Sequence, residues 1–345
     1  MSEFSQRIIA WQRQHGRHDL PWQNTRDPYA IWVSEIMLQQ TQVGAVIPYY
    51  QRFMARFPDV VSLAAASEDD VLQHWSGLGY YSRARNLHAA AVQVMAGHAG
   101  RFPQSPEQLA ELPGIGRSTA AAIAAFAYGH RAAILDGNVK RVLARHFGID
   151  GWPGLPAVEK QMWQLAEQLL PPGEVESYTQ GLMDLGATLC TRSRPTCHRC
   201  PLEADCVAHR EGRVTELPTP KPRKALPERT VTLLLLRDGN DILLEKRPAK
   251  GIWGGLWSLP EMETSADPQQ AVRQRYGLQT EMRPAMPILT HTFTHFRLHI
   301  TPQPLQVTQR MAHASPGIVW LDMEDALDAA VPTPVRTLLR QLLGQ

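Results

Sequence analysis

Four cysteines lie close together in this chain, and the sequence uses cysteine nowhere else. Their spacing is C-x6-C-x2-C-x5-C, at Cys190, Cys197, Cys200 and Cys206. Four thiolates suit either a zinc ion or an iron–sulfur cluster. Structural zinc usually takes its thiolates from two separated pairs, and only one such pair is present, so the spacing favours a [4Fe–4S] cluster over zinc. Two disulfides are a third possibility, but the N-terminus has no apolar signal core, which indicates a reducing compartment where stable disulfides are rare.

A glutamate interrupts an apolar helical stripe early in the chain. In the segment 29–38, the side chains of Ile31, Glu35 and Leu38 share one helix face. Burial in such a stripe raises the pKa of a carboxyl group, and a carboxyl group that stays protonated near neutral pH can act as a general acid. The alternative is that Glu35 faces solvent at the edge of the stripe or pairs with an arginine.

A glycine-containing turn and a second carboxylate follow. Gly114 and Gly116 permit a tight turn in the segment 112–116, and the backbone amides at the start of the next helix could bind a phosphate. An ordinary connection between two helices is the alternative interpretation. Further on, Asp136 is expected to cap the helix that carries Val139 and Val142.

These residues need elements that position them, and the chain divides near residue 215. The pattern is helical from Ile8 to about Ala208, and Asp27 and Ser105, each followed by proline, mark helix starts. A proline-rich basic segment follows, after which a predicted hairpin, a helix over 268–276 and a further strand indicate an α+β domain. We therefore predict a mostly α region over 1–215 with the cysteine loop at 190–206, a linker over 216–229 and an α+β domain over 230–345.

Bulk composition restricts the function less than these motifs do. The chain has 345 residues, a hydrophobic fraction of 43% and a net charge of +2, with a pI near 8.4. This length suggests two domains, and no apolar run is long enough for a membrane span, so we expect a cytoplasmic protein without a membrane segment. The net charge alone does not indicate nucleic-acid binding. Short basic segments could contact DNA or be solvated surface, namely Arg192 with Arg194, and Lys221 with Arg223 and Lys224.

Together, the turn at 112–116, Asp136 and the four-cysteine loop resemble the DNA glycosylases related to endonuclease III, over residues 1 to about 210. Within that superfamily, the segments 35–42, 77–81 and 134–143 resemble MutY-type adenine DNA glycosylases. The resemblance implies a helix–hairpin–helix fold and a monomer that binds duplex DNA. It also implies hydrolysis of the N-glycosidic bond of adenine opposite 8-oxoguanine or guanine, after the adenine has left the helix.

The resemblance implies a role for each matching residue. Glu35 would be the general acid, Asp136 the stabiliser of the cationic transition state, and Asn138 the residue that orients Asp136. The [4Fe–4S] cluster would be structural and would present Arg192 and Arg194 to phosphates. Further implied contacts are the flipped adenine for Gln180, the guanine side of the helix for Gln40 and Tyr80, and DNA phosphate for Gly114, Gly116 and Ser118.

One position bears on how the reaction ends. Bifunctional relatives carry a lysine in the pattern G-x-G-[RK]-K-T-A, where this chain has Ser118. Without that amine the resemblance implies a monofunctional enzyme in which water completes the reaction. Lys140 lies nearby in the sequence and leaves weak strand cleavage open. The rival interpretation is an endonuclease III-like glycosylase/lyase for oxidised pyrimidines, against which Ser118 and the second domain argue.

The C-terminal half resembles a Nudix hydrolase that has lost its metal site. The stretch 254–260 resembles the segment before the magnesium-binding motif, but the aligned residues 271–277 lack the glutamates that hold the metal. The segment 291–296 resembles the loop with which MutY-type enzymes read 8-oxoguanine, with Phe293, Thr294 and His295 in place of the usual Phe-Ser-His. We therefore expect recognition rather than nucleotide hydrolysis. A Nudix nucleotide hydrolase and a non-catalytic DNA-structure sensor are the other classes, disfavoured by the missing glutamates and by the two carboxylates respectively.

Overall fold

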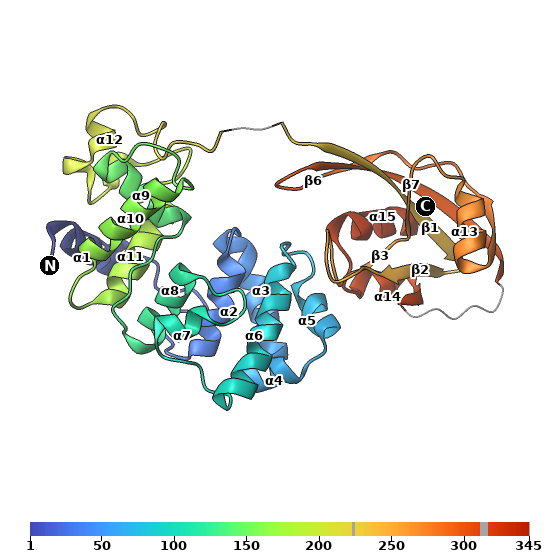
Figure 1. Cartoon of the computed structure of the whole chain (residues 1–345), viewed down its shortest axis with the longest axis horizontal. Helices are drawn as coiled ribbons and strands as arrows, with labels where there is room; N and C mark the ends of the chain where they lie inside the picture. Colours follow the sequence, from blue (N-terminus) through green and yellow to red (C-terminus); the bar gives the residue numbers. More distant parts are fainter. Residues whose placement is uncertain (223–224, 311–316, 345) are drawn as a thin grey trace. The chain divides into compact units, whose positions relative to one another are not determined.

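The computed structural model describes residues 1–222, 225–310 and 317–344. Contacts between residues divide the chain into two compact units, which Figure 1 colours along the sequence. The first, here called the helical unit, comprises Met1–Ala65 and Asn86–Arg223. The second, here called the sheet unit, comprises Ala66–Arg85 and Lys224–Gln345.

The helices that form or enter the helical unit are α1 (Glu3–His15), α2 (Pro28–Leu38), α3 (Val43–Arg56), α4 (Val60–Ala65), α6 (Ser82–His98), α7 (Pro106–Ala110), α8 (Arg117–Tyr128), α9 (Gly137–Phe147), α10 (Pro156–Leu169), α11 (Val175–Thr188), α12 (Val207–Arg210) and two short 3-10 turns, Cys197–Arg199 and Glu203–Asp205. The predicted helix starts are confirmed. Asp27 accepts a hydrogen bond from the Tyr29 amide at the start of α2, and Ser105 accepts one from the Gln108 amide at the start of α7.

The core of the helical unit lies where α1, α8, α9 and α11 meet, around buried side chains that include Ile8, Ala122, Val139 and Leu182. A glycine permits the closest approach. A Cβ at Gly181 of α11 would lie 2.7 Å from Ile8 Cγ2 of α1, which is too short for any larger residue. The helix α11 is thereby held against α1, and it also packs against α9, whose N-terminus carries Asp136.

The sheet unit contains α5 (Glu68–Trp75), β1 (Glu228–Asp238), β2 (Asp241–Lys246), β3 (Trp257–Ser258), β4 (Glu261–Met262), α13 (Pro268–Tyr276), β5 (Leu278–Met282), β6 (Leu289–Thr292), β7 (Arg297–Arg310), β8 (Ile318–Asp322), α14 (Met323–Asp328) and α15 (Thr333–Leu343). The sheet runs in the order β3-β2-β1-β7-β5. β1 and β2 form the predicted antiparallel hairpin, while β1 and β7 run parallel and side by side, as Figure 1 shows. The predicted fold class, a mostly helical region followed by a sheet-containing domain, is confirmed.

The segment between the two regions differs in detail from the predicted linker. Glu228 already belongs to β1, while Leu217 is buried and its carbonyl accepts a hydrogen bond from Arg145 Nε. The hydroxyl of Thr219 accepts one from the Gly151 amide. The beginning of this segment is therefore fixed by side-chain contacts that its proline-rich composition does not reveal. Arg223 and Lys224 lie outside the described residues.

Residues 66–85 fall within the range predicted for the first domain, yet they pack with the C-terminal residues. The Ser76 hydroxyl donates to the Val331 carbonyl at 2.8 Å, and the Gln73 side-chain amide donates to the Asp328 carbonyl at 3.0 Å. No sequence motif predicts these long-range bonds. In the described part of the chain, none of the helices is long and apolar enough to span a membrane.

Candidate active site

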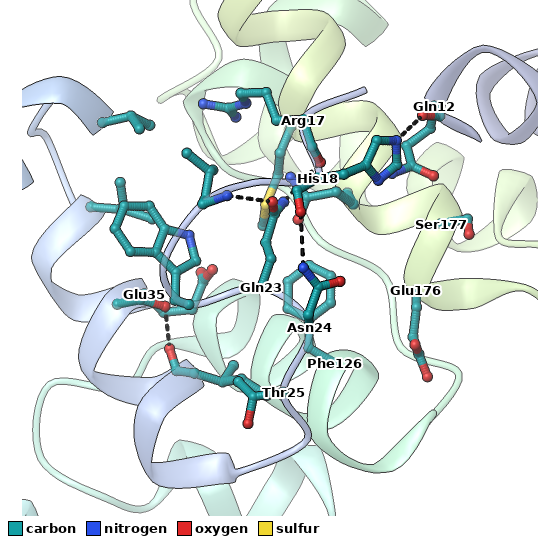
Figure 2. Close-up of a pocket in the computed structure, with 18 of the residues that line it drawn as sticks. Gln12, Arg17, His18, Gln23, Asn24, Thr25, Glu35, Phe126, Glu176 and Ser177 are labelled. Carbon is teal, nitrogen blue, oxygen red and sulfur yellow. Dashed lines mark hydrogen bonds between the residues drawn. The ribbon is translucent and has the colours of Figure 1, made fainter. Parts of the chain in front are cut away.

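A pocket of about 780 Å3 opens in the helical unit, within the volume range of small-molecule sites. Its walls come from α2, from the loop that follows α1, from Phe126 of α8 and from α11. Figure 2 shows residues of the loop lying between Glu35 of α2 and Ser177 of α11. Three stretches of the sequence, residues 12–43, Phe126 and residues 176–183, therefore supply the lining of one cavity.

The loop after α1 is held in place by its own polar side chains. The Gln23 amide donates to the Arg17 carbonyl at 3.0 Å and accepts from the Leu20 amide at 3.1 Å. The Asn24 side chain donates to the His18 carbonyl at 2.9 Å. These bonds, drawn in Figure 2, fix the loop wall of the pocket by satisfying backbone groups that a helix or strand would otherwise pair.

Glu35 lies on the inner face of α2, where it lines the pocket together with Ile31 and Leu38, the two neighbours predicted from the helical stripe. Its side chain is half-buried. Burial raises the pKa of Glu35 to about 8, with a further contribution from the negative charge of Asp136. In the described part of the chain no basic side chain forms an ion pair with Glu35. The carboxyl group is therefore mostly protonated at pH 7 and can give up a proton in the pocket.

Asp136 is the N-cap of α9, as the default interpretation of the sequence predicts, and accepts a hydrogen bond from the Val139 amide at 2.8 Å. Burial raises its pKa, whereas hydrogen bonds from Val139 and Asn138 and the charge of Arg141 act in the opposite direction. The helix N-terminus and these donors favour the ionised form. Asp136 does not line the pocket itself, but its charge acts on Glu35.

Asn138 links Asp136 to the rest of the fold. The Asn138 side chain hydrogen-bonds to Asp136. Its side-chain oxygen Oδ1 also accepts a hydrogen bond from Arg141 Nη2 at 2.7 Å. Arg141 also donates to the Gly186 carbonyl and to the Cys190 carbonyl, each at 2.7 Å. A Cβ at Gly186 would lie 2.5 Å from Asn138 Cβ, so a glycine is required there. Sequence reasoning missed Arg141 and Gly186, because both act through contacts with residues more than forty positions away.

Gln180 lines the pocket from α11, and its amide donates to Asp184 Oδ1 at 2.8 Å. Asp184 is fully buried and forms an ion pair with Arg17, whose Nε, NH2 and backbone amide all lie within 2.9 Å of the carboxylate. Sequence reasoning missed this pair. The signal was present, since Asp184 lies between Leu182 and Leu185 in an apolar stripe, like Glu35.

The glycine-containing turn connects α7 to α8. Gly114 has a left-handed backbone with φ of 78°, and a Cβ there would lie 2.8 Å from Asn86 Cβ. Gly116 is the N-cap of α8, and no side-chain atom lies within 4 Å of the position its Cβ would take. Ser118 is engaged inside the fold, where its hydroxyl accepts a hydrogen bond from the Leu135 amide at 3.0 Å.

Gln40 and Tyr80 share an uncommon backbone conformation. Gln40, exposed just after α2 in the helical unit, has φ of 57°. Tyr80, in the sheet unit, has φ of 50° and a side chain that is 44% exposed. Non-glycine residues in the left-handed region are uncommon and concentrate at functional sites.

The four cysteines surround one small cavity, which Arg145, Leu189, Glu203, His209 and Val214 also line. Buried Arg145 donates to Cys190 Sγ at 3.4 Å and to the Thr191 and Arg192 carbonyls, so it shapes the loop from inside. Burial raises the pKa of Cys200 to about 12. Among the residues that the structure describes, no group of three potential ligands is gathered closely enough to share a single metal ion.

A second pocket, of about 600 Å3, lies in the sheet unit beside the loop that joins β6 to β7. Phe293 stacks on buried Phe296 with ring centroids 4.5 Å apart, while Thr294 and His295 at the tip are exposed. The guanidinium of Arg229 lies 4.6 Å from the centre of the Phe296 ring. The loop therefore combines two stacked phenylalanine rings with exposed polar side chains at its tip. Tyr80, Arg85 and Trp253 also line this pocket.

Comparison with known proteins follows the same two regions. Residues 33–168 match the HhH-GPD superfamily of base excision DNA repair proteins, and residues 231–341 match the NUDIX domain family. A solved thermostable thymine-DNA glycosylase is 32% identical, with a TM-score of 0.55 over 60% of this chain and 95% of its own. An endonuclease III–DNA complex has a TM-score of 0.52 at 20% identity, over 61% of this chain and 94% of its own, which shows a shared fold. The fold and its sequence relatives define a helix–hairpin–helix DNA glycosylase that carries a NUDIX-type domain.

Full-length relatives specify the family. The adenine DNA glycosylase of Buchnera aphidicola subsp. Schizaphis graminum is 35% identical over 97% of each chain. The human adenine DNA glycosylase is 34% identical, over 100% of this chain and 75% of its own. The chain belongs to the adenine DNA glycosylase family of base excision repair enzymes, which confirms the resemblance found in the sequence.

Proposed function

We propose that the chain hydrolyses the N-glycosidic bond of adenine mispaired with 8-oxoguanine or guanine in duplex DNA, with Glu35 as the general acid. The observation that carries this proposal is the state of Glu35. It is a half-buried carboxyl group on a pocket wall, with a pKa raised to about 8, and the charge of Asp136 acts on it. Two carboxyl groups in unlike environments are the usual arrangement for hydrolysis of glycosidic bonds.

The adenine has to leave the base stack before its glycosidic bond can be reached, and the pocket beside Glu35 has room for it. Glu35 donates its proton to N7 of the adenine, which makes the base a better leaving group. The C1′–N9 bond then breaks with both electrons going to the base, and Asp136 stabilises the oxocarbenium-like sugar. Ionised Glu35 takes a proton from a water molecule, whose oxygen attacks C1′, and the product is an abasic site with free adenine.

Two observations support a monofunctional enzyme, in which water rather than an amine attacks the sugar. Ser118 stands where bifunctional relatives have a lysine, and its hydroxyl is bonded to the Leu135 amide. Lys140, the nearby amine, forms an ion pair with Glu159 at 2.6 Å. An amine held as a paired ammonium is a poor nucleophile for the sugar. DNA phosphates are assigned to the amides at the start of α8, after Gly114 and Gly116.

The sheet unit is assigned to recognition of the base opposite adenine. The loop at Phe293, Thr294 and His295 combines an aromatic face with exposed polar groups, which suits contact with a modified purine. Helix α13 has no carboxylate with which to hold magnesium. Gln40 and Tyr80 are assigned to the guanine side of the helix, and their left-handed backbones are consistent with such positions.

The cysteine cavity fits a [4Fe–4S] cluster held by Cys190, Cys197, Cys200 and Cys206. The sequence has one C-x2-C pair with a single cysteine on either side, whereas zinc sites usually draw on two such pairs, so the spacing favours the cluster. The cluster would supply a rigid structural crosslink there, since hydrolysis moves no electrons. Arg192 and Arg194 are exposed on the same loop and are assigned to phosphate contacts.

The decisive experiment is single-turnover cleavage of labelled duplexes that contain A·8-oxoG, A·G, A·T or thymine glycol·A, each with and without alkali. We expect strand breaks only after alkali, on A·8-oxoG and more slowly on A·G. Breaks without alkali on the thymine glycol duplex would show an endonuclease III-like lyase instead. No reaction on any duplex would favour a binding protein.

A separate measurement tests the cluster. The purified protein should have a broad absorbance at about 400 nm. It should also contain about four iron atoms and four sulfides per protein molecule. Cys200→Ser should remove this absorbance. A colourless protein that contains zinc would contradict the assignment.

A further inference from the structure

The amide of Gln180 is held in one orientation by a buried carboxylate. Gln180 Nε2 lies 2.8 Å from Asp184 Oδ1, one helical turn further along α11. A carboxylate accepts hydrogen bonds but donates none, so the NH2 end of the amide must face Asp184. The carbonyl oxygen is therefore the end that Gln180 offers to the pocket it lines.

Arg17 pairs with Asp184 through both its guanidinium and its backbone amide. Asp184 is fully buried, and the Arg17 guanidinium lies 2.6 and 2.7 Å from its Oδ1. The backbone amide of Arg17 donates to Oδ2 at 2.9 Å. Both oxygens of the carboxylate are thus satisfied by donors, which is what a buried charge requires. The same contacts tie α11 to the loop that forms another wall of the pocket.

We propose that Asp184 is a positioning residue that sets base specificity, because it fixes the Gln180 carbonyl oxygen as a hydrogen-bond acceptor in the base pocket. Such an acceptor selects a base that carries a donor. Adenine has an exocyclic amine at C6, whereas hypoxanthine and guanine have an oxygen there and unsubstituted purine has neither. A hypoxanthine oxygen would face the Gln180 oxygen, acceptor against acceptor, which costs binding and leaves a polar group unpaired. This inference rests on the proposed entry of the flipped base into this pocket.

The test compares single-turnover excision of adenine, hypoxanthine and unsubstituted purine, each opposite guanine, by the full-length protein. Asp184→Asn keeps the shape of the side chain, but either orientation of the new amide turns a donor toward a donor of Arg17. The new amide can turn either its oxygen or its NH2 group toward Gln180, so residue 184 no longer requires the NH2 end of Gln180 as a carboxylate does. We expect the ratio of adenine to hypoxanthine excision to fall by about tenfold relative to the unmodified protein, with purine changing least.

Gln180→Leu gives an independent route to the same answer, since Asp184 and its ion pair remain in place. It should lower the same ratio, and adding Asp184→Asn to it should lower the ratio no further. Equal loss of rate on all three bases in Asp184→Asn, with an unchanged ratio, would reduce Asp184 to a structural role and overturn the inference. If Asp184→Asn fails to fold, an unchanged ratio in Gln180→Leu overturns it instead. If the unmodified protein excises no adenine, the proposed function fails first.

Discussion

Two carboxyl groups line or support the same pocket, and they are held in opposite ways. Glu35 of α2 is half-buried beside apolar neighbours, and its pKa rises to about 8. Asp184 of α11 is buried completely, yet Arg17 and Gln180 satisfy it with four donor groups. One wall of the pocket therefore holds a proton that can be given away, and the other is supported by a buried ion pair.

The difference shows that the partners of a buried carboxyl group decide its role more than its burial does. Desolvation disfavours the charged form of both groups. Arg17 supplies an opposite charge and three donor groups to Asp184, whereas the negative charge of Asp136 raises the pKa of Glu35 further. The first arrangement suits general-acid chemistry, and the second suits the positioning of other groups.

The largest effect is expected from Glu35→Gln, which removes the proton donor with little change of shape. The single-turnover rate on A·8-oxoG should fall by about 10²- to 10⁴-fold. The free energy of unfolding at pH 7 should rise by about 1–2 kcal/mol, because the folded protein no longer has to bind a proton that the unfolded chain releases. Urea denaturation measures this second quantity.

Glu3→Gln provides the control, since Glu3 is an exposed carboxylate on α1. It should change neither rate nor stability beyond about 0.5 kcal/mol. A Glu35→Gln protein with nearly unchanged activity would sink the assignment of Glu35 as general acid. A less stable one would mean that the native Glu35 is ionised and paired.

Asp184→Ala is expected to have the opposite effect on stability. It leaves the half-buried Arg17 charge and the Gln180 amide without their acceptor, so the free energy of unfolding should fall by about 1–3 kcal/mol. Arg17→Ala should cost about 3–5 kcal/mol, because it leaves the fully buried Asp184 carboxylate without its guanidinium, and the double variant should cost clearly less than the sum of the two. Urea denaturation of the four proteins gives this coupling energy. Additive effects would show that the ion pair contributes little, and the contrast with Glu35 would then disappear.

The sequence predicts one of these two carboxyl groups and misses the other for a physical reason. Glu35 is recognisable because the stripe that surrounds it, with Ile31 and Leu38, is local. Asp184 also lies in an apolar stripe, but its partner Arg17 is 167 positions away, and only the fold brings them together. The packing of residues 66–85 with the C-terminal residues is equally a long-range effect.

Local signals predict the elements themselves well. The caps at Asp27 and Ser105, the hairpin around Gly239 and the helix over 268–276 all depend on residues within a few positions of each other, and all are confirmed. The proline-rich composition predicts a linker over 216–229. It does not reveal the contact of Leu217 with Arg145, because these two residues are distant in the sequence.

An effect of intermediate size is expected from pH, which tests whether Glu35 acts in its protonated form. Because the pKa of Glu35 is raised to about 8, the protonated form is present below that pH and is lost above it. The single-turnover rate should fall by about tenfold for each pH unit well above 8. The free energy of unfolding should depend on the same group. The contribution of Glu35 should be lost as pH rises from the pKa of glutamate in the unfolded chain toward 8, and it should stay constant above pH 8. A rate that stays flat up to pH 9.5 would contradict a protonated Glu35.

The smallest effect is expected from Arg17→Lys, and it sharpens the other side of the comparison. Lysine keeps the positive charge but cannot reproduce the two guanidinium contacts with Asp184, so stability should fall by only about 1–2 kcal/mol. The Asp184 side chain is unchanged in this variant and pairs with the lysine ammonium, so the Gln180 amide still donates to it and keeps its orientation. The preference for adenine over hypoxanthine should accordingly survive in Arg17→Lys, although it is lost in Asp184→Asn. If both variants lost the preference equally, the geometry of the guanidinium, rather than the charge of Asp184, would be what orients Gln180.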